Sequence, residues 1–391
     1  MPLSLCFQAK RYAKPISPTQ RVQRNHRVVV VISSVIHRLY KPLSMTTQTV
    51  QSAKKSASGL VGTRQHQASQ VHSPVRVGQS EENRNKENQD KKKLWMAALK
   101  PPMYCVAIAP ICAGSAVAYQ RTGQFQLCPF LLFVTSAILL LIWENLSNDV
   151  FDATTGIDEN KHHSLVNLTR NRRLIFWLSN LSLLLGVAGV FLISIWQKDP
   201  TVLALVLACC VLGYLYQGPP FRLGYKGLGE ILCFFSFGPL AVGAAYYAQT
   251  QSWQGAWLAR ASLLPTAFVL GMTTTLVLFC SHFHQVEDDL KAGKKSPVAR
   301  LGTKRSAQLL PWLCGSVFVI SGVAVAQSAL PFSSVLLFAS LPVAFKLCQH
   351  VLTFHDQPAR VSNAKFLAIH FHFWSGLLLM AGLLLPATLA P

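Results

Sequence analysis

Nine long apolar segments follow residue 100, and they constrain the fold of this chain more than any other feature. Most approach the roughly 20 residues that a helix needs to cross a hydrocarbon core of about 30 Å, and the fourth is short. Only helices and closed barrels satisfy every backbone polar group in lipid, and barrel strands would alternate in hydropathy, which these segments do not. We therefore predict an all-α, polytopic membrane helical bundle in residues 100–391. The segments are 101–119, 127–147, 174–196, 201–216, 228–248, 262–281, 308–330, 332–350 and 366–388.

Composition and loop charge agree with this topology. Hydrophobic residues make up 51% of the chain and charged residues only 13%, about half the charged share of a soluble protein. If nine helices cross the membrane, the loops on one side hold fourteen Lys and Arg, and the loops on the other hold three. The positive-inside rule then assigns the basic loops to a cytoplasm-like side. The basic loops are 148–173, 217–227, 282–307 and 351–365, and the other side carries Arg121, Lys198 and Arg260.

The first 80 residues differ from the rest of the chain in charge. They contain no Asp or Glu but twelve Lys and Arg, together with many Ser, Thr and Gln. An acid-free terminus rich in Arg and Ser is typical of an organelle transit peptide. A nucleic-acid-binding arm would also be basic, but no interleaved aromatic residues support it, so we expect no nucleic-acid partner. We predict a disordered transit peptide over 1–80 and a polar linker over 81–99.

An acidic cluster closes the second apolar segment. In a helix that runs out of this segment, Asp149 and Asp152 are three residues apart and share a face. Asn148 can orient a carboxylate or a metal-bound water, and Asp158 follows in a predicted loop. Carboxylates at a membrane mouth are costly and therefore indicate function. Mg²⁺ binds through one or two carboxylates, water and substrate phosphates, so this spacing suits it. The alternative is an ordinary polar end of a helix.

A second acidic cluster follows the sixth apolar segment, on the same predicted side of the membrane. It contains Gln285, Glu287, Asp288 and Asp289, and Lys294 comes five residues later. Two acidic clusters that face one pocket indicate a divalent cation, and a cation beside lysines indicates a diphosphate. The alternative interpretation is a connecting loop of mixed charge.

Other polar residues near the two clusters are weaker candidates. Arg222 can grip a phosphate bidentately, although an interfacial arginine that sets topology is an equal alternative. Lys161 and Lys294 are the further candidate diphosphate ligands. His282 and His284 are two residues apart and would point in different directions on a helix, so we do not expect a zinc site.

The two motifs resemble those of the UbiA-type superfamily of membrane prenyltransferases. Its first motif has the form NDxxD with a further Asp, matched here by Asn148, Asp149, Asp152 and Asp158. The runs NDVFDATTGIDENKHHSLVNLT and HFHQVEDDLKAGKKSPVARLGT resemble the plastid and cyanobacterial branch that prenylates 1,4-dihydroxy-2-naphthoate. Asp158 comes later than in the usual spacing, and Gln285 stands where the family has the first Asp of its second motif.

The resemblance implies a function, which we state as an expectation. The chain would transfer a phytyl or other prenyl group from its diphosphate to 1,4-dihydroxy-2-naphthoate, with decarboxylation, in phylloquinone or menaquinone synthesis. Its cofactor would be Mg²⁺, and it would lie in a plastid membrane with the motif loops on the stromal side. Within the same fold, homogentisate, chlorophyllide and haem are alternative acceptors. From a different class, a transporter or a quinone- or lipid-binding membrane protein remains open. A transporter would be expected to carry ionisable groups near the middle of its helices, whereas these acids gather at one face.

Overall fold

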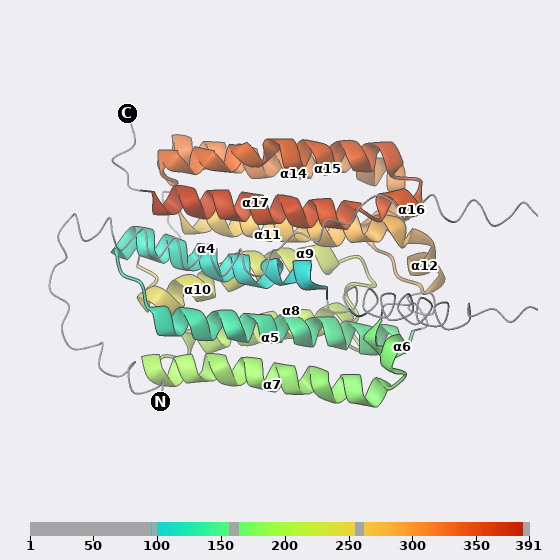
Figure 1. The fold of residues 1–391 in the computed structure, drawn as a ribbon, viewed down its shortest axis with the longest axis horizontal. Coiled ribbons are helices and arrows are strands. Elements are labelled where there is room, and N and C mark those ends of the chain that lie inside the picture. The colour runs from blue at the N-terminus through green and yellow to red at the C-terminus, as the bar shows by residue number, and fades with distance from the viewer. Residues whose placement is uncertain (1–94, 96–99, 156–163, 255–261, 386–391) are drawn as a thin grey trace, which may run out of the picture.

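The computed structural model describes residues 95, 100–155, 164–254 and 262–385, and its long helices run side by side (Figure 1). Within these ranges the chain is helical and contains no strand, which confirms the predicted all-α membrane bundle. The predicted transit peptide and, apart from Trp95, the predicted linker lie outside the described residues, as do Asp158 and Lys161.

The predicted apolar segments correspond to the helices of the described chain. Eight of them form helices that are long and apolar enough to cross a membrane, and the fourth, α8, is a shorter apolar helix. The elements are η2 (Pro101–Met103), α4 (Tyr104–Thr122), α5 (Leu127–Asp152), α6 (Leu165–Thr169), α7 (Arg172–Gln197), α8 (Thr201–Gln217), α9 (Gly229–Phe235), η3 (Ser236–Leu240), α10 (Ala241–Thr250), α11 (Leu263–Ser281), η4 (His282–His284), α12 (Val286–Lys291), α13 (Pro297–Leu301), α14 (Thr303–Ala326), η5 (Phe332–Ser340), α15 (Leu341–Phe354), α16 (Pro358–Val361) and α17 (Ala364–Leu384).

Two of the predicted helices are irregular. The fifth segment is α9 and α10 joined by a π-helical turn, η3, which contains Pro239. The eighth segment begins as the 3₁₀ helix η5 and becomes an α-helix only at Leu341. Pro342 stands at this junction, and a proline has no N–H with which to continue the hydrogen-bonding pattern of the preceding turn. Apolar periodicity alone does not reveal such changes of helix type.

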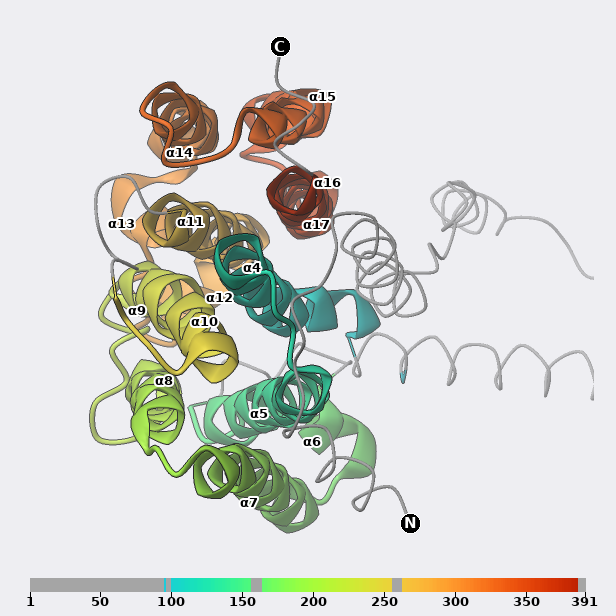
Figure 2. The same ribbon diagram turned by 90° about the vertical axis from the view of Figure 1, so that its left-hand side faces the viewer.

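The core lies around α4 and α11, the spans with the largest buried share of residues. Viewed along the helices, these two lie between α5, α7 and α8 on one side and α14 and α15 on the other (Figure 2). Small residues let the central backbones approach. A Cβ added at Gly238 would lie 2.6 Å from the carbonyl oxygen of Ala267 and 3.0 Å from Cα of Gly271. Close packing of this kind drives helix association in lipid, because the hydrophobic effect does not favour helix–helix contact over helix–lipid contact there.

Helix order brings both sequence motifs to one end of the bundle. The first motif occupies the last turns of α5, and the second lies just after α11, in η4 and α12. The short helices α6, α12 and α16 all lie at the same end in Figure 1. The two motif loops therefore lie at the same end of the bundle, as the sequence predicted.

Candidate active site

Asp152 is held in place by side chains from two segments of the chain. It occupies the last turn of α5 and is 7% exposed. Asn148, one turn earlier, donates its Nδ2 hydrogen to Asp152 Oδ2 at 2.8 Å. The Tyr225 hydroxyl, from the loop between α8 and α9, donates to Asp152 Oδ1, also at 2.8 Å. The predicted role of Asn148 in orienting a carboxylate thus has a geometric basis.

Asp149 engages different neighbours from Asp152. It is buried, and its Oδ2 accepts a hydrogen bond from the backbone N–H of Leu165, at the start of α6, at 2.9 Å. Its Oδ1 lies 3.9 Å from Nζ of Lys100, just before the first membrane helix. The two aspartates of the first motif are therefore fixed by separate parts of the chain, although both end at the same mouth of the bundle.

Asp289 is the buried acid of the second motif. Ser296 Oγ donates to Asp289 Oδ2 at 3.0 Å, and His282 Nδ1 lies 3.2 Å from the same oxygen. Lys294 Nζ lies 3.5 Å from Asp289 Oδ1. Burial raises the pKa of this carboxyl, but the His282 hydrogen bond and the Lys294 charge outweigh burial and leave the pKa below its usual value. Asp289 is thus held as a carboxylate.

The other members of the second cluster are more accessible than Asp289. Asp288 and Gln285 are partly buried, and Glu287 is exposed on α12. The backbone N–H of Asp289 donates to the carbonyl of Gln285 at 2.7 Å, so Gln285 begins the turn that carries the acid. The structure therefore distinguishes one buried acid, Asp289, from two outer acids, Glu287 and Asp288.

The ring of Tyr225 lies between the two motifs. Its hydroxyl bonds Asp152 of the first, while Nζ of Lys294, from the second, lies 5.8 Å from the ring centroid. The backbone N–H of Lys295 donates to the Tyr225 carbonyl at 2.8 Å. Burial, followed by the Asp152 charge, raises the pKa of Tyr225, so its hydroxyl stays protonated and remains a donor. One aromatic residue thus joins Asp152 to the Lys294–Asp289 pair.

Two of the predicted diphosphate ligands, Arg222 and Lys294, lie close to this ring. Arg222 is 5.7 Å from the Tyr225 centroid and donates its Nη2 hydrogen to Thr154 Oγ1 at 3.2 Å. Lys294 is nearly buried, at 9% exposure, and faces Asp289. Among the described residues, no three His, Cys, Asp or Glu side chains converge closely enough to hold a metal ion by themselves. A metal here would need oxygens from water or substrate, as Mg²⁺ commonly uses.

Four residues that shape this site were not among the site residues predicted from the sequence. Tyr225 and Ser296 gave no signal beyond their position in polar loops. His282 links two acids, because its Nδ1 faces Asp289 and its Nε2 lies 3.6 Å from Glu230 Oε1. Both carboxylate oxygens of Glu230 are buried and accept no hydrogen bond from the described residues. Glu230 stands at the start of an apolar segment, and that position was the one available signal.

The fold and the site define a class: a polytopic membrane protein with a charged centre at one mouth of its helical bundle. Residues 107–377 match the UbiA prenyltransferase family, and the chain belongs to this family. The family resemblance drawn from the two motifs is thereby confirmed.

Two curated relatives cover most of the chain. The 2-carboxy-1,4-naphthoquinone phytyltransferase of Synechocystis sp. is 54% identical over 291 residues, which are 74% of this chain and 93% of that protein. The chloroplastic 2-carboxy-1,4-naphthoquinone phytyltransferase of Arabidopsis thaliana is 38% identical over 295 residues, 75% of this chain and 77% of the relative. A solved UbiA homologue from Archaeoglobus fulgidus, bound to DMAPP and Mg²⁺, aligns with TM-score 0.42 and 15% identity over 73% of this chain and 98% of that chain.

We expect Tyr225→Phe to lower kcat/KM for prenyl transfer about tenfold. A hydrogen bond to a charged group contributes roughly 1.5 kcal/mol of stabilisation. If that stabilisation is lost from the transition state, the activation free energy rises by about 1.4 kcal/mol for each tenfold loss of rate. The matched control is Tyr247→Phe, which removes a similar bond, from the Tyr247 hydroxyl to Asp199 Oδ2 at 2.7 Å, at the other end of the bundle. Steady-state kinetics of both variants in the same membranes check this, and equal losses would mean that Tyr225 acts only on the fold.

Proposed function

We propose that this chain transfers a phytyl group from phytyl diphosphate to 1,4-dihydroxy-2-naphthoate, with loss of CO₂, in phylloquinone synthesis. The observation that carries the proposal is the grouping of Asp152, Asp289 and Lys294 around Tyr225 at the mouth of an apolar bundle. Carboxylates beside a lysine suit a metal-bound diphosphate, and apolar helices suit the hydrocarbon tail. The names of the Synechocystis and Arabidopsis relatives support a phytyl donor and a naphthoquinone-type acceptor.

Mg²⁺ fits the donor atoms at this mouth. All the candidate ligands are carboxylate oxygens, which hard cations prefer. Asp289 Oδ1 is buried and accepts no hydrogen bond from the described residues, and its recorded charged neighbour is Lys294 Nζ at 3.5 Å, so its lone pairs are not all occupied by donors. We propose that Asp149, Asp152, Asp288 and Asp289 hold Mg²⁺ together with water and diphosphate oxygens. Bound there, the metal would neutralise the charge that develops on the departing diphosphate.

The chain's own residues have separate parts in the proposed reaction. Lys294 and Arg222 bind the diphosphate as it leaves, while Asn148 and Tyr225 keep Asp152 oriented. The apolar helices exclude water from the allylic cation that forms when the C–O bond breaks. The ring carbon that bears the carboxyl group then forms the new C–C bond. Loss of CO₂ and the carboxyl proton restores the aromatic ring.

A prenyl-acceptor panel tests this proposal. Membranes that contain the chain are supplied with phytyl diphosphate, with Mg²⁺ or with EDTA, and with one acceptor at a time. We expect product from 1,4-dihydroxy-2-naphthoate with Mg²⁺ and none in EDTA, with activity restored when excess Mg²⁺ is added back. Product in EDTA would contradict the metal–diphosphate mechanism, and a preference for homogentisate or chlorophyllide would contradict the acceptor. Membranes without the chain are the control.

We propose that the chain resides in a plastid membrane, with the motif loops and the mature N-terminus on the stromal side. The acid-free residues 1–80 and the chloroplastic Arabidopsis relative support this location. A fluorescent reporter fused after residue 90 is expected to enter plastids, because the basic segment acts as a transit peptide. Imaging checks this against a reporter in which the basic residues of 1–80 are replaced by Gln. A cytosolic signal from the unaltered fusion would contradict the proposal.

A further inference from the structure

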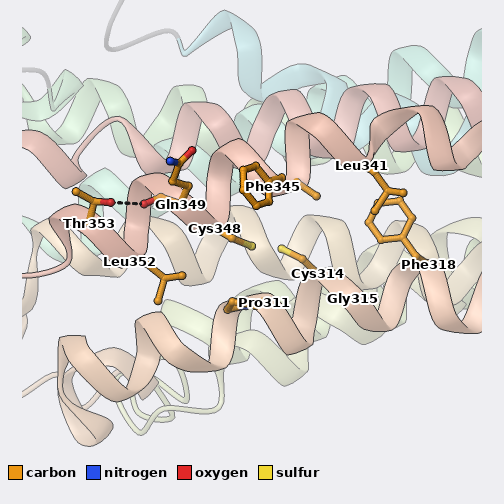
Figure 3. Close-up of a pocket in the computed structure, with 11 residues that line it drawn as sticks. Pro311, Cys314, Gly315, Phe318, Leu341, Phe345, Cys348, Gln349, Leu352 and Thr353 are labelled. Atoms are coloured by element: carbon orange, nitrogen blue, oxygen red, sulfur yellow. Dashed lines mark hydrogen bonds between the residues drawn. The ribbon is translucent and has the colours of Figure 1, made fainter.

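An apolar groove runs between α14 and α15, at the edge of the bundle. Its volume is about 480 Å³, within the range of about 300–1,000 Å³ that is usual for ligand sites. Cys314 and Phe318 of α14 face Phe345 and Cys348 of α15 across it (Figure 3). Helices α11 and α17 separate this edge from α5, which carries the first motif (Figure 2). None of the residues that line the groove belongs to either motif, so the groove is distinct from the candidate active site.

The groove has room for a ligand. A Cβ added at Gly315, on the α14 side, would meet no atom within 4 Å. Phe345 is 69% exposed and Leu352 is 43% exposed, so the α15 side opens outwards. Both helices belong to predicted membrane spans, so we expect the outward side of the groove to contact lipid acyl chains. Water does not fill an apolar space, because it finds no hydrogen-bond partners there. A hydrocarbon tail can fill it and gain dispersion contacts with its walls.

One end of the groove is polar and basic. Gln349 and Thr353 line it towards the C-terminal end of α15, the end at which the motif loops lie. The hydroxyl of Thr303 and Nδ1 of His355, 3.1 Å apart, join the start of α14 to the end of α15 there. Lys304 is exposed in the first turn of α14.

Helical spacing aligns Lys304 with the groove. Lys304 precedes the groove residues Pro311 and Gly315 by seven and eleven positions, so it shares their face of α14. Arg305 is rotated away by about 100°. At this end of α14 and α15, Lys304, Arg305 and Arg360 outnumber Asp356, the one acid of the sequence between residues 296 and 365. The charge at this end of the groove is therefore complementary to an anionic group.

We propose that the groove between α14 and α15 binds an anionic glycerolipid of the membrane. One acyl chain lies between the two helices, over Gly315 and Cys348, and the anionic headgroup lies beside Lys304 at the motif end of the bundle. Such a lipid joins the edge helices α14 and α15, and it stabilises the folded chain because it binds that state alone.

Native mass spectrometry of the full chain tests the proposal. The protein is exchanged into nanodiscs of phosphatidylcholine that contain a minor fraction of phosphatidylglycerol, and the retained lipid is identified. We expect one retained phosphatidylglycerol on the wild-type chain. Gly315→Phe should abolish it by filling the groove, whereas Gly315→Ala should keep it. Lys304→Gln should weaken retention about fivefold, the effect of one lysine beside an anionic headgroup. Arg305→Gln removes the same charge from another face and should have a smaller effect.

Several results would overturn the proposal. They are equal retention of phosphatidylglycerol and phosphatidylcholine, undiminished retention by Gly315→Phe, or a dimer of the chain that Gly315→Phe dissociates. Retention of a prenyl diphosphate instead would also overturn it. Size-exclusion chromatography checks that each variant folds. A second measurement needs no variant: phosphatidylglycerol with a photoreactive acyl chain should label peptides of α14 and α15 in the wild type, and labelling confined to other helices would contradict the site.

Discussion

Replacing Asp152 with asparagine is expected to lower kcat/KM for prenyl transfer by at least about 100-fold, the usual loss when one electrostatic group that stabilises a transition state is removed. Asparagine keeps the shape of the side chain but not its charge. Tyr225 can still donate to the amide oxygen, whereas the bond from Asn148 loses a charged acceptor. The expected loss is therefore one of charge at the diphosphate rather than of folding.

The matched control for this variant is Asp199→Asn. Asp199 also accepts a tyrosine hydroxyl, from Tyr247, but it lies in the turn between α7 and α8, at the other end of the bundle. We expect kcat/KM of the control to stay within about twofold of the wild type, as is usual for surface changes of about 0.5 kcal/mol or less. Kinetics at saturating Mg²⁺ compare the two variants. A wild-type rate for Asp152→Asn would remove Asp152 from the proposed site.

Replacing Asp289 with asparagine is expected to destabilise the fold and to remove activity together. The change leaves Lys294, which is almost buried, without its carboxylate. Breaking a buried ion pair from one side costs about 3 kcal/mol. SDS titration of the purified protein measures this loss in the free energy of unfolding, and the acceptor assay measures activity on the same sample.

A double variant separates the two effects. Asp289→Asn/Lys294→Met removes both charges of the pair. It should recover most of the lost stability, because replacing a buried ion pair with uncharged side chains of similar volume is often neutral. Activity should remain lost, because the proposed reaction needs both the carboxylate and the ammonium group at the diphosphate. If activity returned together with stability, the Asp289–Lys294 pair would be structural only. If neither returned, the destabilisation would have a cause other than the unpaired charge.

Much of the fold follows from local sequence. Each apolar segment is long because the hydrocarbon core must be crossed, and this requirement acts on one segment at a time. Asp149 and Asp152 were also predictable from local sequence, because two residues three positions apart share a face of one helix. Irregularities such as η3 and η5 were not predicted, because a few residues around Pro239 and Pro342 change the helix type without changing the hydropathy.

The site was predictable only in part. The acids of both motifs were identified from their position at the ends of apolar segments, and helix order explains why they meet at one end of the bundle. Asp288 and Asp289 could not be told apart, because spacing does not show which of two neighbouring faces is buried. The metal-ligand and diphosphate roles of these residues stay predictions, and Asp158 and Lys161 lie outside the described residues.

The sequence by itself determined the membrane-spanning class, the family and the two acidic motifs, because each depends on the order of residues within a single segment. Only the tertiary structure decided how those motifs are joined. Tyr225 reaches Asp152 across 73 positions, and Glu230 lies 3.6 Å from His282 although they belong to different helical segments. Such contacts depend on how far each helix is rotated and shifted against its neighbours. That arrangement is set by the packing of small side chains between helices, such as Gly238 against Gly271.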